Sequence, residues 1–273
     1  MTIDNFLEFV EYFLDKNYCF ISPVDILNGI KNDKKYIMIS FDDGYYNNKY
    51  ALKILKKYNI PAVLFPSTDN IKQNKCFWWD VLYRERIKSG LSLRNIVSEQ
   101  NQLKTKTTEK IEKYIIENFS KKALKPKGDI DRPFTTFELR DFSKEKYIFL
   151  GNHTSNHAIL TNYSSDEIKS KILDAQDAIY NISGIIPRII SYPNGNYSDE
   201  IVIISKKIGI NIGVTTDLKK NKLPLYSKEK RCMYLGRFDL SGSTNIKQQC
   251  ELFRSDNLIY PKISNFLNTK FTK

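Results

Sequence analysis

The fold is decided by residues 36–44, which read YIMISFDDG. The first six residues are mostly apolar and β-favouring, and Asp42, Asp43 and Gly44 follow them directly. β-Branched and aromatic residues suit a buried strand, and glycine permits the sharp turn that ends it. The stretch therefore predicts a buried strand whose carboxyl end exposes two carboxylates.

Helices and strands alternate on either side of this strand. Apolar residues recur at helical spacing over 6–14 and 47–58, and an apolar run at 62–65 predicts a second strand. A strand, a helix and a strand in this order predict a parallel pair. Further strands are predicted at 148–151, 188–192, 212–215 and 234–238, with helices at 165–182 and 199–207. These units predict an α/β fold, either a parallel barrel or an open doubly wound sheet, with its site at the strand carboxyl ends.

One long segment interrupts the alternation. Residues from about 69 to 132 are polar and mostly helical in pattern, and 109–119 form the clearest amphipathic stretch. We interpret 69–132 as a helical insertion after the second predicted strand. Since 273 residues suffice for one large α/β domain, we expect a single domain over 1–273.

The net charge of +12 raises the question of an anionic partner. Lysines are scattered through most segments, so we rank a solvated basic surface ahead of nucleic-acid binding and expect no nucleic-acid partner. An anionic sugar substrate, carrying phosphate, pyrophosphate or carboxylate, is the intermediate hypothesis, because a basic surface would attract it.

The cysteines and the N-terminus bear on location. The four cysteines form no C-x-x-C pair and are expected to be reduced and mostly buried. Residues 1–10 carry Asp4 and Glu8 and do not read as an export signal, and no stretch approaches a membrane span. We expect a cytoplasmic location, with peripheral membrane contact left open.

The two adjacent aspartates predict a division of roles. Neighbouring side chains on a strand point to opposite faces, so Asp42 and Asp43 can share a site only where the strand ends and the backbone turns. One carboxylate would bind a cation, and the other would act as base for a water whose pKa the cation lowers. Taken alone, the Asp-Asp-Gly sequence favours ordinary turn chemistry over a metal site.

The only two histidines strengthen the metal hypothesis. His153 and His157 stand four residues apart after a predicted strand, and on a helical turn both imidazoles would face one metal. The alternative is two unrelated surface histidines. Two imidazoles and a carboxylate leave coordination positions open for water and substrate, and they suit zinc, with iron, cobalt and manganese as alternatives.

The sequence contains ISFDDG at 39–44, GNHTSNH at 151–157 and SYPNGNYSD at 191–199. These three motifs resemble those of the polysaccharide deacetylases, the NodB-homology group related to carbohydrate esterase family 4, and the last is similar to the Tyr-Pro-x-Gly version of the third motif. The FWWD sequence at 77–80 is similar to a subgroup of these enzymes. The resemblance covers roughly residues 6–239.

The resemblance implies a distorted (β/α) barrel that removes acetyl groups from N-acetylated sugars by metal-assisted hydrolysis. It makes Asp42 the catalytic base and Asp43 a metal ligand beside the two histidines. The backbone N–H of Asn194 would help to stabilise the oxyanion. The substrate implied is an N-acetylated sugar or oligosaccharide of a surface polysaccharide or its cytoplasmic precursor, with lipid or nucleotide linkage left open.

This chain departs from the family pattern at two points. The family commonly has an arginine two residues before the third-motif proline, where this chain has Ser191, and Arg188 and Arg237 are the possible substitutes. The late histidine that serves as general acid has no counterpart, so Asp42 acting twice, Asp239 or solvent must protonate the leaving amine. The competing hypothesis is a non-catalytic carbohydrate-binding protein with a degenerate deacetylase fold.

Aromatic side chains near the motifs offer platforms for sugar rings, with core packing as the alternative. The predicted substrate-contacting set is Tyr45, Trp78, Trp79, Tyr192, Pro193 and Arg237. Tyr46 and Tyr197 are further aromatic candidates outside this set.

Overall fold

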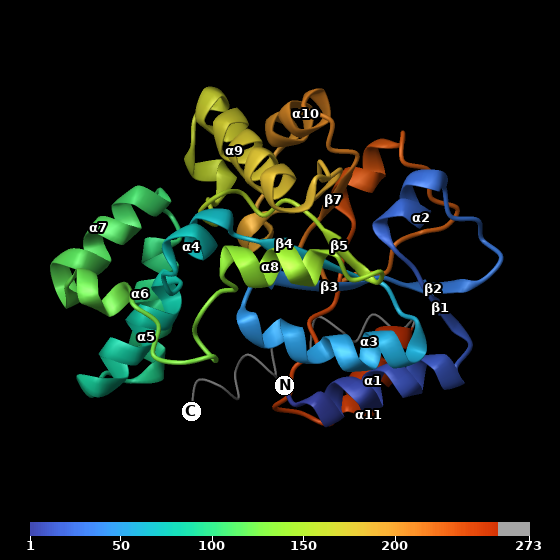
Figure 1. The fold of residues 1–273 in the computed structure, drawn as a ribbon, viewed down its shortest axis with the longest axis horizontal. Coiled ribbons are helices and arrows are strands. Elements are labelled where there is room, and N and C mark those ends of the chain that lie inside the picture. The colour runs from blue at the N-terminus through green and yellow to red at the C-terminus, as the bar shows by residue number, and fades with distance from the viewer. Residues whose placement is uncertain (256–273) are drawn as a thin grey trace.

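The computed structural model describes residues 1–255, and parallel strands form its centre (Figure 1). Strands β3 (Ile39–Asp43), β4 (Ala62–Pro66) and β5 (Ile148–Leu150) pair in that order, with Ile39 opposite Ala62 and Ala62 opposite Ile148. Strands β6 (Ile189–Ser191) and β7 (Ile212–Val214) form a second parallel pair. A bridge between Asn152 and Ile190 joins the two groups.

The stretch 36–44 is two strands instead of one. Strand β2 (Lys35–Ile37) pairs with β1 (Tyr18–Phe20), and β3 begins at Ile39 and pairs with β4. The break at Met38 therefore moves the chain from one parallel pair to the next. The five residues of β3 still end in the two aspartates, as the sequence predicts.

Helices cover the outside of these strands (Figure 1). Around the strands lie α1 (Ile3–Asp15), α2 (Pro23–Asn28), η1 (Tyr46–Ala51), α3 (Leu52–Tyr58), α8 (Thr136–Ser143), η3 (Leu160–Asn162), α9 (Ser165–Ser183), α10 (Asp199–Lys207) and α11 (Ile246–Arg254). The arrangement is a distorted (β/α) barrel, which decides between the barrel and the open sheet that the sequence allowed.

Strand β4 shows where the core lies. Val63 and Phe65 pack inward with residues of β6 and β7, whereas Ala62 and Leu64 pack outward with residues of α1, α3 and α8. Alternate side chains of a strand point to opposite faces, so β4 contributes to both layers. All five of its residues are buried, as expected for a parallel strand covered on both sides.

The predicted insertion is helical. It contains α4 (Thr68–Gln73), α5 (Trp78–Lys88), α6 (Leu93–Leu103), α7 (Thr108–Phe119) and η2 (Lys121–Leu124). Its helices have their own core, in which Val81, Leu82, Leu103, Ile111 and Ile115 are almost wholly buried. Figure 1 shows α5, α6 and α7 side by side, on the side of the barrel where α4 follows β4. The insertion therefore lies next to the carboxyl ends of the strands.

The strand predicted at 234–238 is wrong. Residues 230–234 form η5 (Lys230–Tyr234), and only Leu235 bridges to β7, at Val214. The next two backbone N–H groups turn away, because Gly236 donates to the Asn221 side chain (2.9 Å) and Arg237 to the carbonyl of Asp217 (3.0 Å). Local β-favouring composition could not reveal these competing partners.

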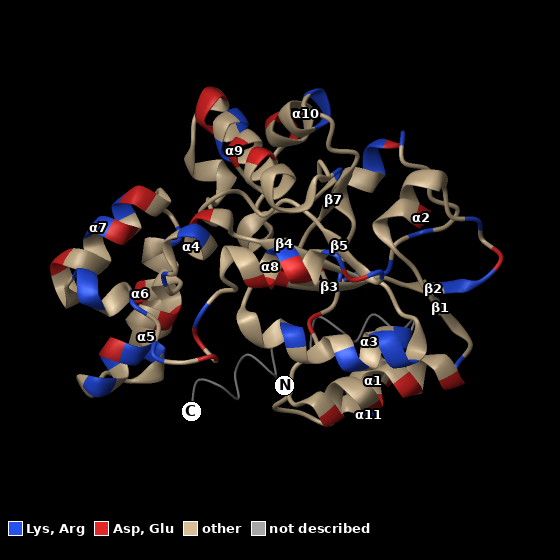
Figure 2. Cartoon of the chain, viewed as in Figure 1, with Lys and Arg blue, Asp and Glu red and all other residues tan. Residues whose placement is uncertain are grey.

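Basic and acidic residues are interspersed along the outer helices (Figure 2). The cysteines are free thiols, three of them buried. Within residues 1–255 there is no helix with the length and apolar character required to cross a bilayer.

Candidate active site

The end of β3 brings both aspartates to one place. Asp43 has a positive φ of 70° and Gly44 one of 82°, so the backbone turns at the second carboxylate. This left-handed conformation is uncommon for residues other than glycine, although aspartate tolerates it better than most. The turn is closed by a hydrogen bond from the Gly44 N–H to the Asp42 carbonyl (2.8 Å). Both carboxylates therefore lie at the carboxyl edge of the barrel.

The histidines lie on an irregular loop after β5, not on a helical turn. Thr154 and His157 have positive φ values of 58° and 53°. The Asn152 side chain accepts a hydrogen bond from the Thr154 N–H (2.8 Å), and the Thr154 hydroxyl accepts one from the Ala158 N–H (2.7 Å). Side-chain acceptors of this kind compete with helical bonding, which is why the four-residue spacing does not form a helix here.

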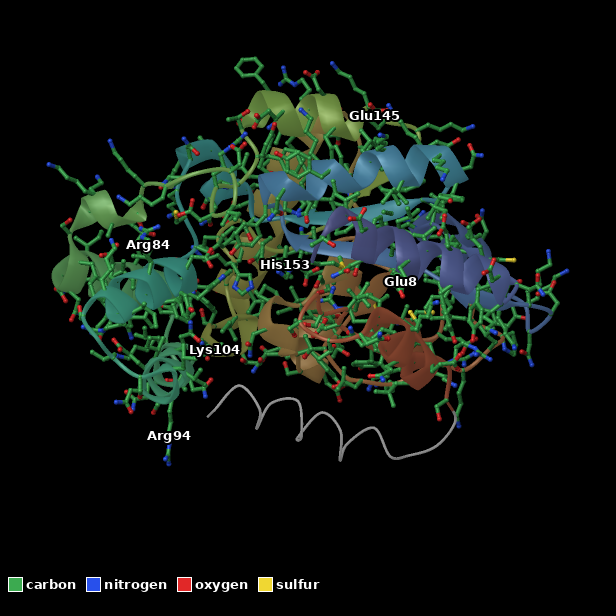
Figure 3. The ribbon with its side chains drawn as sticks, turned by 90° about the horizontal axis from the view of Figure 1, so that it is seen from below. Glu8, Arg84, Arg94, Lys104, Glu145 and His153 are labelled. Atoms are coloured by element: carbon green, nitrogen blue, oxygen red, sulfur yellow. The ribbon has the colours of Figure 1, made fainter. Side chains whose placement is uncertain are left out.

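The loop nevertheless brings both imidazoles to Asp43. Asp43 Oδ1 lies 3.4 Å from His153 Nε2 and 3.6 Å from His157 Nε2. One ligand atom from each residue can be chosen so that all three lie within 4.8 Å of one another. Figure 3 places His153 near the middle of the molecule, whereas Arg94 points outward from the insertion.

The chemistry of these atoms fits a divalent cation. His153 Nδ1 lies 2.7 Å from the Ser191 carbonyl, which can only accept, so Nδ1 carries a proton, and in the neutral ring the lone pair of Nε2 faces Asp43. Among residues 1–255, the buried Asp43 Oδ1 has no hydrogen-bond partner. Acceptor atoms facing one another this closely repel unless positive charge lies between them.

Electrostatic effects point the same way. Burial lowers the pKa of His157 to about 4, so this ring is neutral and able to ligate near neutral pH. Burial also acts to lower the pKa of His153, but the charges of Asp42 and Asp43 outweigh it and raise that pKa overall. The two carboxylates thus attract positive charge, whether proton or cation, to this point.

Asp42 is held by an arginine that lies 195 positions later in the sequence. Arg237 Nη1 donates to Asp42 Oδ1 (2.8 Å), Nη2 donates to Oδ2, and the Ser191 hydroxyl also donates to Oδ2 (3.2 Å). Ser40, which shares a strand face with Asp42, accepts from Arg237 Nη1 (3.2 Å). Although burial opposes ionisation, His153, Arg237 and Ser191 lower the pKa of Asp42 to about 2.

Of the two possible substitutes for the arginine missing before the third-motif proline, Arg237 is the one that contacts Asp42. It was predicted as a substrate contact and as a substitute for the missing arginine, and the structure places its fork on Asp42. Arg188, the other possible substitute, instead bonds the Asn211 side chain (2.9 Å). Ser40 was missed, although its place two residues before Asp42 on one strand was a usable signal.

The third motif lies against the other side of the site. Tyr192 is wholly buried in a cluster with Tyr197 and Ile190, and Pro193 is buried beside it. Neither side chain is exposed at the surface, and substrate contact by these two residues stays a prediction. Asn194 is exposed after β6 and has a φ of 57°. The next residue, Gly195, also has a positive φ and lies too close to Thr216 to carry a side chain.

The aromatic residues of the insertion divide into two groups. Trp78 is 8% exposed and packs in the insertion core, the alternative that the sequence left open, and its assignment as a sugar contact stays a prediction. Trp79 is only partly buried, its ring lies 4.6 Å from the His157 ring, and its Nε1 donates to the Tyr45 hydroxyl (2.9 Å). Tyr45 in turn donates to Asp80 Oδ2 (2.5 Å). Trp79 and Tyr45 therefore border the candidate metal site.

Two acidic residues near the site have raised pKa values. Burial is the main cause of the rise of the Asp80 pKa to about 6, and the charge of Asp43 adds to it. Desolvation also raises the pKa of Asp239, with Asp42 adding and Arg237 opposing. Asp239 is exposed at the surface, consistent with access to solvent protons.

The fold and the site define a class: a (β/α)-barrel protein with an Asp-His-His candidate metal site and an arginine-bound aspartate at its strand carboxyl ends. The family model for "Polysaccharide deacetylase" matches residues 29–133 and 135–213. The chain belongs to the polysaccharide deacetylase family.

Individual relatives are distant. The Bacillus subtilis (strain 168) protein YxkH, assigned to the polysaccharide deacetylases, is 22% identical over 208 residues, which cover 74% of this chain and 54% of YxkH. The chain thus spans about half the length of this curated relative.

Two solved structures share the fold. The Streptococcus pyogenes deacetylase PplD, solved in complex with acetate, has a TM-score of 0.60 at 19% identity, covering 91% of this chain and 85% of PplD. IcaB from Ammonifex degensii has a TM-score of 0.61 at 12% identity, covering 93% of this chain and 90% of IcaB. At these identities the likeness establishes the barrel fold alone.

Proposed function

We propose that this protein is a metal-dependent carbohydrate N-deacetylase that hydrolyses the acetyl amide of an amino sugar. The observation that carries the proposal is the convergence of Asp43, His153 and His157 within 4.8 Å, beside an aspartate oriented by Arg237. Family membership supports the reaction class.

The ligand set supports zinc as the metal. Two imidazoles and one carboxylate are a typical catalytic zinc set with open coordination positions. When bound, the ion supplies Lewis-acid polarisation of the amide carbonyl and lowers the pKa of water. His153 is fixed in the ligating tautomer by the Ser191 carbonyl.

Asp42 is the proposed base. Arg237 and Ser191 hold its carboxylate in one orientation while Oδ2 stays 4.0 Å from His153 Nε2, next to the ligand cluster. A fixed carboxylate at this distance can take a proton from an attacking water without first reorienting. The exposed Asn194, at the carboxyl end of β6, is proposed to offer its backbone N–H to the developing oxyanion.

The leaving amine must gain a proton, and both histidines belong to the proposed ligand set. The sources are Asp42 returning the proton that it accepted, Asp239, or water. An Asp239→Asn variant separates Asp239 from the other two sources. If Asp239 is the obligatory acid, the variant should lower kcat about 100-fold, whereas the other two routes predict an almost unchanged kcat.

The proposed substrate is an N-acetylated sugar unit of a surface polysaccharide or its precursor. The net charge of +12 supports a preference for an anionic form, such as one with a phosphate or pyrophosphate link. A basic surface would increase the encounter rate with such a substrate, and added salt would lower kcat/KM.

The test is release of acetate from an N-acetylated oligosaccharide in the presence of zinc. Wild-type protein should release acetate, and Asp42→Asn should abolish release while keeping the fold. Full activity in Asp42→Asn would contradict the mechanism. Sugar binding without acetate release under zinc, cobalt, manganese or iron would support the alternative function, a carbohydrate-binding protein that lost its acid.

A further inference from the structure

The two histidines of the cluster differ in how their second nitrogen is satisfied. His153 Nδ1 donates to the Ser191 carbonyl at 2.7 Å. His157 Nδ1 is buried and has no hydrogen-bond partner among the described residues 1–255. A ligating histidine normally donates its other N–H to an acceptor, which fixes its ring and tautomer. His157 therefore needs another source of orientation.

The helical insertion contacts His157 through Trp79. The indole ring packs edge-to-face on the imidazole, with ring centroids 4.6 Å apart and planes at 63°. The indole is itself fixed, because Phe77 stacks on it at 4.7 Å and its Nε1 donates to the Tyr45 hydroxyl. This packing restricts rotation of the His157 ring without using its Nδ1.

A second contact reaches the neighbouring residue of the loop. Glu109, at the start of α7, accepts from Asn156 Nδ2 (3.1 Å), Lys171 Nζ (2.6 Å) and the Tyr163 hydroxyl (3.0 Å). A carboxylate only accepts hydrogen bonds from these groups, so the amide of Asn156 must turn its nitrogen to Glu109. Its carbonyl oxygen, buried and without a partner among residues 1–255, then faces elsewhere.

A cavity adjoins these groups. It has a volume of about 20 Å³, and Trp79, Asn156 and His157 are among the residues that line it. A volume of this size holds one water molecule, provided that polar partners are present. Asn156 and His157, which line the cavity, each have a buried polar atom without a partner among residues 1–255: His157 Nδ1, which can donate, and Asn156 Oδ1, which can accept.

We propose that the insertion positions the metal ligand His157 in two ways. Trp79 packs against its ring, and Glu109 orients the amide of Asn156. One water in the cavity then accepts a hydrogen bond from His157 Nδ1–H and donates one to the Asn156 carbonyl oxygen. The inference rests on the proposed metal site, and it makes Trp79 and Asn156 positioning residues. The insertion is then required for the metal affinity of a cluster whose ligands all lie outside it.

The test measures zinc affinity of the full chain by calorimetry, with no sugar present. Asn156→Ala and Trp79→Phe should each raise the Kd for zinc about 10-fold, the low end of the effect of outer-shell changes on metal sites. Tyr83→Phe and Glu99→Gln are matched controls, because Tyr83 is an exposed aromatic residue of α5 outside the cavity lining and Glu99 pairs with Arg86 within the insertion. Both controls should keep wild-type affinity.

Thermal unfolding and the visible spectrum of the cobalt-loaded protein complete the experiment. A residue with a purely structural role would lower Tm and leave the cobalt spectrum unchanged, whereas the proposal requires a shifted spectrum in Asn156→Ala and Trp79→Phe. Wild-type affinity in both variants would overturn the proposal, as would equal losses in both controls. Failure of the wild-type chain to bind zinc or cobalt would instead overturn the metal site itself.

Discussion

Two partly buried carboxylates flank the candidate metal site, and their surroundings are opposite. Asp42, at the end of β3, receives both arms of Arg237 and the Ser191 hydroxyl, and its pKa falls to about 2. Asp80, on α5 of the insertion, receives the Tyr45 hydroxyl, and burial raises its pKa to about 6. The barrel stabilises charge beside the site, whereas the insertion mainly supplies apolar cover.

This difference separates chemistry from positioning. The end of β3 provides the base, Asp42, and the segment after η5 provides Arg237, which holds the base in the defined orientation that proton transfer needs. The insertion provides aromatic rings and a low-dielectric wall, which strengthen electrostatic interactions within the site. Variants on the two sides should therefore fail in different ways.

The largest effect is expected on the barrel side, in Asp43→Ala. This variant loses the only anionic ligand of the cluster, so zinc affinity should fall on the order of 1000-fold, beyond the 10- to 100-fold typical of outer-shell changes. Calorimetric titration of the zinc-free protein measures it. Tight zinc binding by the variant would place the metal elsewhere.

The second-largest effect is expected for Arg237→Met, also on the barrel side. Removing the guanidinium leaves Asp42 without its cation in a partly buried place, at a cost of about 3 kcal/mol in the free energy of unfolding, the low end for a buried pair. Urea unfolding measures stability, and acetate release should fall with it because the base loses its orientation. Arg188→Met is the control, since Arg188 bonds Asn211 instead. Equal effects of both variants would remove the special role of Arg237.

On the insertion side, Ile115→Ala should cost about 2 kcal/mol, the low end for truncation of a buried isoleucine. Both tryptophans of the chain, Trp78 and Trp79, lie in the insertion, so their fluorescence reports on it directly. In this variant the fluorescence transition in urea should precede the circular-dichroism transition of the whole fold. Coincident transitions would show that insertion and barrel unfold as one unit.

The smallest effect concerns Asp80 and pH. Because its folded pKa is raised to about 6, the ionised form opposes folding, and this penalty develops as pH rises from about 4 through 6. Asp80→Asn removes the penalty, so the free energy of unfolding of the variant relative to wild type should rise by about 1 kcal/mol between pH 4 and pH 8. The full pKa shift would give a larger change, but solvent screening of this partly exposed carboxylate reduces it. A constant difference across that range would show that Asp80 has a normal pKa.

Much of the barrel was predictable because its signals are local. Apolar runs ending in Asp42 and Asp43, and a second run ending before His153, place chemical groups at strand ends, and parallel strands bring those ends to one edge. The family motifs were equally local. These features depend on residues close together in the sequence.

The remainder depends on contacts that no local pattern reveals. Arg237 meets Asp42 across 195 positions, so spacing could not show that it bonds the base. The His153–His157 loop avoids a helix because Asn152 and Thr154 bond its backbone. Tyr192 looked available for a sugar, but the packing of α9 and α10 against β6 buries it completely.

The same 195-position separation has a consequence for the order of folding. Closing a loop of this length costs chain entropy, and that cost is recovered only when the intervening β–α units have assembled. Asp42 therefore gains its partner late, after the barrel between them is in place. A partly folded chain would hold the aspartates and histidines without an oriented base, so competence for catalysis should emerge only at the final stage of folding.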